Sequence, residues 1–192
     1  SPCTLEDAVQ IIDAPVGTVE WFVVPDPSVS FTGPQGGPFT SSRTFTIRNT
    51  GSAALFWDVS KLSPTSWFDL PVNPTGTLAA GQQANITITL TSAAETLLPG
   101  IHTAMIQFSV PCTTSGPDTR QRQVRLTVYN LSDLKREMEV DLEDWSGLAE
   151  TWKQNCAEPD WCGGADLNRS GAVDIHDLLV FAQEGLFFLE AR

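Results

Sequence analysis

The chain has 192 residues, and 23 acidic against 11 basic side chains give it a formal net charge of −12. A chain this acidic lacks the basic surface that binds nucleic acids or anionic membranes, so we expect neither partner. No run of about 18 apolar residues is present, which excludes a membrane-spanning helix. Its four cysteines form no Cys-x-x-Cys pair and therefore favour disulfides in a secreted, extracellular or cell-surface protein.

The composition changes near residue 130. Residues 1–130 carry nine acids and six bases, whereas residues 131–192 carry fourteen acids and five bases. The first part is rich in Thr, Val, Ser, Gly and Pro, and the second contains most of the helix-forming residues. We therefore expect two domains, 1–130 and 131–192, the first mainly β and the second a small α domain.

The sequence of the first domain predicts about seven short strands separated by turn residues. They fall near 16–24, 29–31, 43–49, 55–59, 85–90, after Pro99-Gly100 and at 121–129. Their alternating apolar residues are expected to face inward: Phe45, Ile47, Leu55, Trp57, Val59, Ile86, Ile88, Leu90, Ala104, Ile106, Phe108, Val110, Val124, Leu126 and Val128. Alternation of this kind predicts an immunoglobulin-like antiparallel β-sandwich.

Turn and core motifs of this domain point to a family. They are Phe31-Thr-Gly-Pro-Gln-Gly-Gly-Pro-Phe39, Thr44-Phe-Thr-Ile-Arg-Asn-Thr-Gly51, Leu55-Phe-Trp57, Ser66-Trp-Phe68, Thr75-Gly-Thr-Leu-Ala-Ala-Gly81 and Leu98-Pro-Gly-Ile-His-Thr103. Over roughly residues 16–130 the chain resembles the BACON-like immunoglobulin-type domains of secreted bacterial proteins. The resemblance implies a spacer beside catalytic or adhesive modules, with carbohydrate binding in some members.

A twelve-residue calcium-type loop at 166–177 is the strongest chemical signal in the sequence. Oxygen-bearing side chains stand at positions 1, 3, 5, 9 and 12, position 6 is a glycine, and position 7 offers its backbone carbonyl. The expected ligands are Asp166, Asn168, Ser170, Ala172, Asp174 and Asp177. Three carboxylates give a modest charge, which predicts calcium affinity in about the micromolar range.

A second, degenerate copy lies 33 residues earlier, at 133–144. Asp133, Glu137, Asp141 and Asp144 remain as candidate ligands, but position 3 is Lys135 and position 6 is Met138. Either this loop binds calcium weakly or Lys135 neutralises the carboxylates in place of a metal. The alternative without metal is a helix start with a solvated acidic face.

Each loop leads into a predicted helix. The apolar residues expected on one face are Leu142, Trp145, Leu148, Ala149 and Trp152 in the first repeat, 133–152, and Ile175, Leu178, Leu179, Ala182 and Leu186 in the second, 166–186. Two such loop–helix repeats resemble a dockerin domain. The resemblance implies two calcium loops and recognition of a cohesin partner by loop positions 10 and 11. Those positions are Leu142 and Glu143, then Ile175 and His176, unlike the small hydroxyl pair of cellulosomal dockerins.

The cysteines predict two disulfides. Cys156 and Cys162 lie in the connection between the two helices and are expected to pair, which leaves Cys3 to pair with Cys112. Trp21, Trp57 and Trp67 could stack on sugar rings, but tryptophans at such positions usually fill a sandwich core. Neither a catalytic motif nor a phosphate loop is present, so we expect a protein that is not an enzyme.

Together these features predict a non-catalytic extracellular attachment or assembly module. Calcium would fold the dockerin-like domain, whose helix faces would bind a cohesin-like domain, a second copy or the sandwich itself, with the sandwich as spacer. Two alternatives remain open. One is a carbohydrate-binding accessory region of a secreted polysaccharide-degrading enzyme, and the other is a structural subunit of an extracellular assembly.

Overall fold

The computed structural model describes residues 18–113, 116–158 and 160–189, with only the backbone described for residue 112 and residues 184–189. In chain order the elements are β1 (Trp21–Val24), β2 (Ser28–Pro34), β3 (Ser42–Asn49), β4 (Leu55–Lys61), β5 (Phe68–Asp69), β6 (Thr75–Leu78), β7 (Gln83–Leu90), the 3-10 helix η1 (Ser92–Thr96), β8 (Gly100–Thr113), β9 (Gly116–Tyr129), α2 (Leu142–Glu150) and α3 (Ile175–Leu189). Within the part of the chain that the structure describes, we find no helix with the length and hydropathy of a membrane span.

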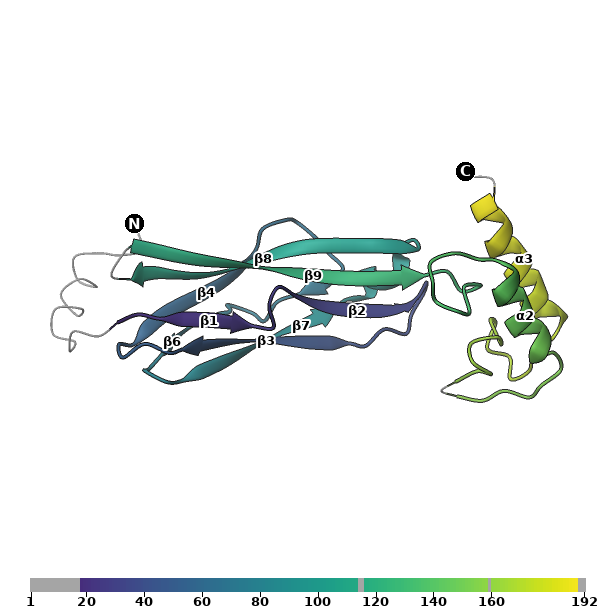
Figure 1. Ribbon diagram of the computed structural model, residues 1–192, viewed down its shortest axis with the longest axis horizontal. Coiled ribbons are helices and arrows are strands. Elements are labelled where there is room, and N and C mark those ends of the chain that lie inside the picture. The colour runs from purple at the N-terminus through teal and green to yellow at the C-terminus, as the bar shows by residue number, and fades with distance from the viewer. Residues whose placement is uncertain (1–17, 114–115, 159, 190–192) are drawn as a thin grey trace. The chain divides into compact units, whose positions relative to one another are not determined.

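The strands form two sheets of an immunoglobulin-like β-sandwich (Figure 1). Within the described residues, one sheet has the order β1-β3-β7-β5 and the other the order β2-β9-β8-β4-β6. The register of β3 against β7 pairs Phe45 with Ile86, and both side chains are buried. The predicted mainly β, immunoglobulin-like fold class is therefore confirmed for this part of the chain.

The core of the sandwich consists of the alternating apolar residues that the sequence marks. All the residues expected to face inward are buried except Leu90, which is half-buried near the end of its strand. Phe45 and Phe108, from opposite sheets, meet edge to face with 5.6 Å between ring centroids. Such aromatic pairs add stability beyond the area that they bury, which helps to fix how the two sheets pack.

Several strand boundaries differ from the prediction. The short strands β5 and β6 were not expected, because two or four residues are too few to show an alternating pattern. β8 and β9 run for 14 residues each, longer than the pattern of buried residues, because their outer ends are exposed or half-buried. In the described residues β1 begins only at Trp21.

The described residues divide into two compact units. The first ends at Leu126, and the second runs from Thr127 onward and also includes the short segments Thr32–Pro38 and Thr96–Gly100. The second unit has its own small core of Leu148, Ala165, Leu167, Val173 and Phe181. A core this small supplies little stability alone, so other constraints are needed to hold the unit together.

Candidate functional site: two loops with one backbone design

The two loops predicted from the sequence, loop 1 (133–144) and loop 2 (166–177), fold with the same hydrogen bonds. In each, the position 1 carboxylate, Asp133 or Asp166, accepts the backbone N–H groups of positions 5 and 6. The distances are 3.0 and 2.8 Å in loop 1, and 2.9 and 2.8 Å in loop 2. The N–H and carbonyl groups of a short loop cannot all pair among themselves, so the buried carboxylate serves as the shared acceptor that shapes the turn.

The position 12 carboxylate, Asp144 or Asp177, plays the matching role at the other end of each loop. It accepts the N–H groups of positions 3 and 9, at 2.9 and 2.9 Å in loop 1, and at 3.1 and 2.8 Å in loop 2. Position 9, Asp141 or Asp174, in turn accepts the N–H of position 11 and caps the helix that follows. Each loop therefore leads directly into α2 or α3 through the same cap.

Positions 4 and 6 take the left-handed backbone conformation in both loops. At position 4, Arg136 and Arg169 have φ values of 61° and 56°, and at position 6, Met138 and Gly171 have φ values of 73° and 98°. This conformation costs a residue with a Cβ atom about 1–2 kcal/mol, whereas glycine adopts it without that cost. Loop 1 therefore has the backbone shape of loop 2, but at position 6 it bears the conformational cost of Met138 where loop 2 has Gly171.

The four carboxylates at positions 1 and 12 are the buried acidic residues of the described chain. Asp133, Asp144, Asp166 and Asp177 are 1, 0, 2 and 0 % exposed. None of the ion pairs formed by described residues involves any of them. A buried charge is costly unless an opposite charge or a metal ion compensates it. Each carboxylate oxygen that accepts one N–H still has a lone pair for a cation.

In loop 2 the remaining predicted ligands are polar groups of mixed kind. The Ser170 hydroxyl donates to the Ala172 carbonyl at 3.3 Å, so two of the predicted ligand oxygens are neighbours. Asn168 accepts the Ser170 N–H at 2.8 Å through its side-chain oxygen. The backbone N–H of His176 holds the pKa of Asp174 below its usual range, and the His176 ring adds to this effect. Asp174 is thus kept ionised, as a calcium ligand must be.

In loop 1 the structure brings three of the predicted carboxylates together. Oxygens of Glu137, Asp141 and Asp144 all lie within 4.8 Å of one another. Ligands around one calcium ion at 2.3–2.6 Å have such spacings. Partial desolvation raises the pKa of Glu137, and repulsion from four other carboxylates of the loop raises it further. The side chain of Lys135 forms none of the ion pairs found among described residues, so the idea that it neutralises this cluster has no support in the structure.

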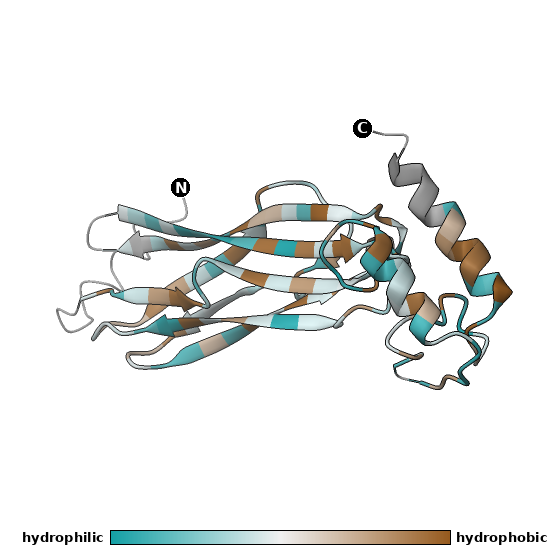
Figure 2. Cartoon of the chain, turned by 45° about the vertical axis from the view of Figure 1, so that its right-hand side comes forward, coloured by the Kyte–Doolittle hydropathy of each residue, from teal (hydrophilic) through white to brown (hydrophobic). Residues whose placement is uncertain are grey.

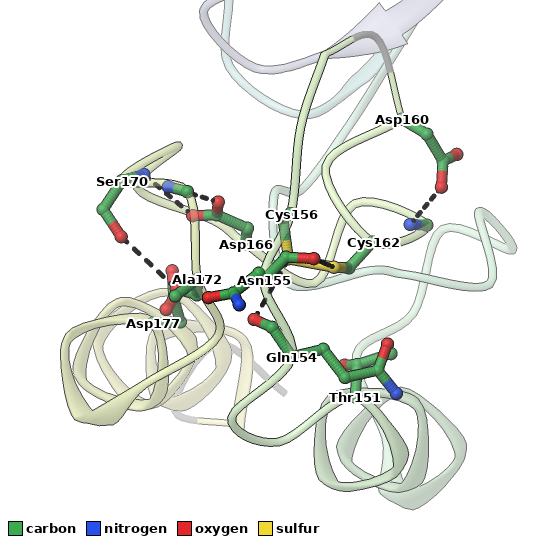
Figure 3. Close-up of a disulfide and its surroundings, with 12 residues drawn as sticks. Thr151, Gln154, Asn155, Cys156, Asp160, Cys162, Asp166, Ser170, Ala172 and Asp177 are labelled. Carbon is green, nitrogen blue, oxygen red and sulfur yellow. Dashed lines mark hydrogen bonds between the residues drawn. A yellow bond between two sulfur atoms is a disulfide. The ribbon is translucent and has the colours of Figure 1, made fainter.

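A short segment after α2 pairs with loop 2. The Lys153 N–H donates to the Val173 carbonyl at 2.9 Å, and the Val173 N–H donates to the Gln154 carbonyl at 3.0 Å. One residue further on, Asn155 and Ala172 form an antiparallel bridge. Figure 3 shows this segment beside the loop and next to the disulfide. In paired loops of this type, the apolar residue at position 8 usually contacts the other loop. In loop 2 that residue is Val173, and its backbone pairs with residues 153–154 instead.

The predicted disulfide between Cys156 and Cys162 is present. It closes the segment between the two loops, as Figure 3 shows. The other predicted pair lies outside the described residues, because Cys3 is not among them and only the backbone of Cys112 is described. The Cys3–Cys112 disulfide therefore stays a prediction.

The apolar faces predicted for the two helices are buried only in part. In α2 Leu148 is buried and Leu142 is exposed, while the partly exposed Trp145 ring meets Phe181 edge to face with 5.8 Å between ring centroids. Trp152 is exposed just beyond the helix. In α3 Phe181 packs into the core, while Ile175 and Leu179 are 60 and 55 % exposed. These short helices each bury a narrow face in a small core, which leaves further apolar residues of the predicted faces in solvent. Figure 2 shows the apolar stretch along the first part of α3.

The sandwich residues considered for sugar binding are core residues. Trp21, Trp57 and Trp67 are 5, 6 and 7 % exposed, so no ring face is open for stacking. The indole N–H of Trp21 donates to Asp118 at 2.8 Å, and Gly76 lies directly against the Trp57 ring. The interpretation of these tryptophans as core residues is confirmed.

Comparison with known proteins finds likeness in structure only. No family model matches the chain, and no curated protein matches it in sequence. The PapD-like domain 7 of human CEP192 is similar at 15% identity and a TM-score of 0.47, covering 59% of this chain and 87% of that chain. The Escherichia coli chaperone DraB is similar at 12% identity and a TM-score of 0.44, covering 57% of this chain and 55% of that chain.

A third similar structure is the CsuC–CsuE chaperone–tip adhesin complex of Acinetobacter baumannii, at 11% identity and a TM-score of 0.45. The match covers 57% of this chain and 52% of that chain, so this chain spans about half the length of the two bacterial proteins. At this level the likeness concerns the sandwich fold alone. It carries no argument about function.

Proposed function

We propose that the chain is a non-catalytic extracellular attachment module whose second unit is a dockerin-like domain folded by calcium. The observation that carries this proposal is the set of four buried carboxylates without ion pairs, Asp133, Asp144, Asp166 and Asp177. They occupy equivalent positions in two loops with equivalent hydrogen bonds. Repeated burial of unpaired charge is expected where a cation completes the structure.

Loop 2 fits calcium by the chemistry of its donors. Asp166, Asp174 and Asp177 offer carboxylate oxygens, to which Asn168, Ser170 and the Ala172 carbonyl add neutral oxygens. Bound there, Ca²⁺ supplies the positive charge that offsets the buried carboxylates. The backbone N–H groups hold Asp166 and Asp177 in place before any ion arrives. Binding energy gained in this way becomes folding energy, because the unfolded chain has no such site.

Loop 1 is proposed as a weaker site for the same ion. Its carboxylates lie close together and Asp133 and Asp144 have the same backbone partners as their counterparts. The cationic Lys135, however, stands at the position where loop 2 has the neutral ligand Asn168. A positive charge at a ligand position opposes a second positive charge in the loop.

The attachment surface is proposed to consist of the exposed apolar residues at the start of each helix. Leu142 and Ile175, both at loop position 10, are 82 and 60 % exposed. Trp145 and Leu179 extend the apolar surface of their respective helices, and Trp152 stands exposed just beyond α2. Exposed apolar and aromatic residues of this kind mark surfaces that bind proteins. The partner would be a cohesin-like domain, with the BACON-like sandwich acting as spacer.

The extracellular location is supported by the Cys156–Cys162 disulfide, because such bonds persist in oxidising compartments. Trp21, Trp57 and Trp67 are buried, so the carbohydrate-binding alternative loses the residues on which it rested. Protein attachment is therefore favoured over sugar binding.

Calcium-dependent unfolding tests the proposal. The melting temperature of the second unit, followed by near-UV circular dichroism, is expected to rise when calcium is added to metal-stripped protein. The rise should disappear in Asp177→Ala and persist in Glu150→Ala, which removes an exposed carboxylate of α2 outside both loops. A melting temperature that calcium leaves unchanged in the wild-type chain would contradict the proposal.

A further inference from the structure

The disulfide-closed segment between the helices holds loop 2 at two places. On one side, residues 153–156 form an antiparallel pairing with residues 171–173. The Cys156 N–H completes this pairing by donating to the Gly171 carbonyl at 2.8 Å. Residues 171–173 are positions 6–8 of loop 2. The segment that carries Cys156 therefore fixes the middle of the loop.

On the other side, the residues around Cys162 fix the entry into the loop. The Asp166 N–H donates to the Trp161 carbonyl at 3.1 Å, and the Ala165 N–H donates to the Cys162 carbonyl at 3.3 Å. Trp161 and Cys162 are both left-handed, with φ values of 49° and 57°, and Gly163 and Gly164 continue in that conformation. Asp166, at position 1, thus follows directly from a turn that two residues with Cβ atoms adopt only under constraint.

We propose that the Cys156–Cys162 disulfide is a redox control on calcium affinity at loop 2. With the bond intact, the pairing segment and the entry turn are tied together and the loop is held in its binding shape. Without the bond, the left-handed turn relaxes and the pairing of residues 153–156 with residues 171–173 weakens. A smaller fraction of molecules then has loop 2 in its calcium-binding shape. Apparent affinity falls by that fraction. This inference rests on the proposed calcium site.

The chemical step is a thiol–disulfide exchange with a dithiol. The dithiol donates two electrons and two protons, the bond between the Cys156 and Cys162 sulfurs breaks, two thiols form, and the dithiol becomes a disulfide. Both cysteines are only half-buried, so a reductant can reach them. The control applies to loop 2, since the backbone hydrogen bonds of this segment go to residues 171–173 and 166.

The first test measures calcium affinity by isothermal titration in the full chain, comparing the oxidised wild type with a Cys156→Ser/Cys162→Ser variant. We expect the variant to bind calcium at least about tenfold more weakly. The matched control is Cys3→Ser/Cys112→Ser, which is expected to keep the affinity of the wild type. Equal affinity in the wild type and the 156/162 variant would overturn the inference.

A second measurement needs no variant and so stands even if the double substitution prevents folding. Coupling between two sites is reciprocal, so calcium must stabilise the disulfide by the factor with which the disulfide strengthens calcium binding. The equilibrium between reduced and oxidised Cys156–Cys162, set with dithiothreitol buffers and read by thiol labelling and mass mapping, should shift about tenfold toward the disulfide with saturating calcium. An equilibrium unmoved by calcium would overturn the inference, whereas absent calcium binding in oxidised wild type would overturn the calcium site itself.

Discussion

Loops 1 and 2 share a backbone and differ in chemistry. Each loop has a buried carboxylate at both ends, and each of these carboxylates accepts two backbone N–H groups from equivalent positions. Each loop also starts a helix with the same cap. Loop 2 places neutral oxygens and a glycine between these anchors, whereas loop 1 places Lys135, Glu137 and Met138 there. The anchoring aspartates therefore determine the shape of the loop. We propose that the residues between them determine how well the loop holds an ion.

The difference also shows what each loop needs from its surroundings. Loop 2 is supported by a paired segment and a disulfide, and its position 6 is a glycine. Loop 1 has Met138 in the left-handed conformation, and it gathers three carboxylates whose repulsion helps to raise the pKa of Glu137. Loop 1 therefore carries strain and charge that a bound cation would relieve only in part.

The largest expected effect comes from removing an anchor. Asp177→Ala should abolish calcium stabilisation, which amounts to about 2.7 kcal/mol when calcium is a hundredfold above the dissociation constant. Asp144→Ala removes the equivalent anchor of loop 1 and should leave the tighter site in place. Thermal unfolding with and without calcium measures both. A calcium-dependent shift that survives in Asp177→Ala would place the tighter site elsewhere.

Exchanging the residues at position 3 of the two loops should have the next largest effect, a change in calcium affinity. Lys135→Asn gives loop 1 the residue of loop 2 and should strengthen calcium binding there at least about tenfold, because a cation no longer opposes the ion. Asn168→Lys makes the reverse change and should weaken loop 2 by a similar factor. Isothermal titration of the two variants checks the pair. If Asn168→Lys bound calcium as the wild type does, the role assigned to position 3 would be wrong.

The smallest expected effects concern position 6. Gly171→Ala should destabilise the second unit by about 1 kcal/mol, because alanine pays for the left-handed conformation that glycine adopts freely. The added Cβ has room, since its nearest neighbour would be the Cys156 carbonyl oxygen at 3.8 Å, so the cost is conformational. Met138→Gly should stabilise the unit by about the same amount. Chemical denaturation of both variants measures this, and effects of the opposite sign would contradict the assignment.

The sequence predicts the sandwich core well because burial there follows the two-residue repeat of a strand. Phe45, Ile47 and Phe108 are fully buried as expected. The loop geometry is likewise predictable from spacing, since positions 1, 3, 5, 6, 9 and 12 have fixed roles in this type of loop. Short strands such as β5 leave no readable pattern, because their residues are placed by the neighbouring strand β7.

The helix faces and the support of loop 2 could not be predicted in the same way. The buried side of α3 is set by where Phe181 meets the small core, and a helical repeat alone does not choose between Phe181 and Leu179. The pairing of residues 153–154 with Val173 depends on how the chain returns after α2. The signal that could have pointed to it is Cys156, which ties the segment to the residues just before loop 2.

We propose that loop 2 holds a calcium ion that folds the second unit. Native mass spectrometry of metal-stripped and calcium-loaded protein tests it most directly. At micromolar calcium we predict one retained ion in the wild type and in Asp144→Ala, and none in Asp177→Ala. A wild-type chain that retains no calcium, or an Asp177→Ala chain that retains one, would contradict the claim.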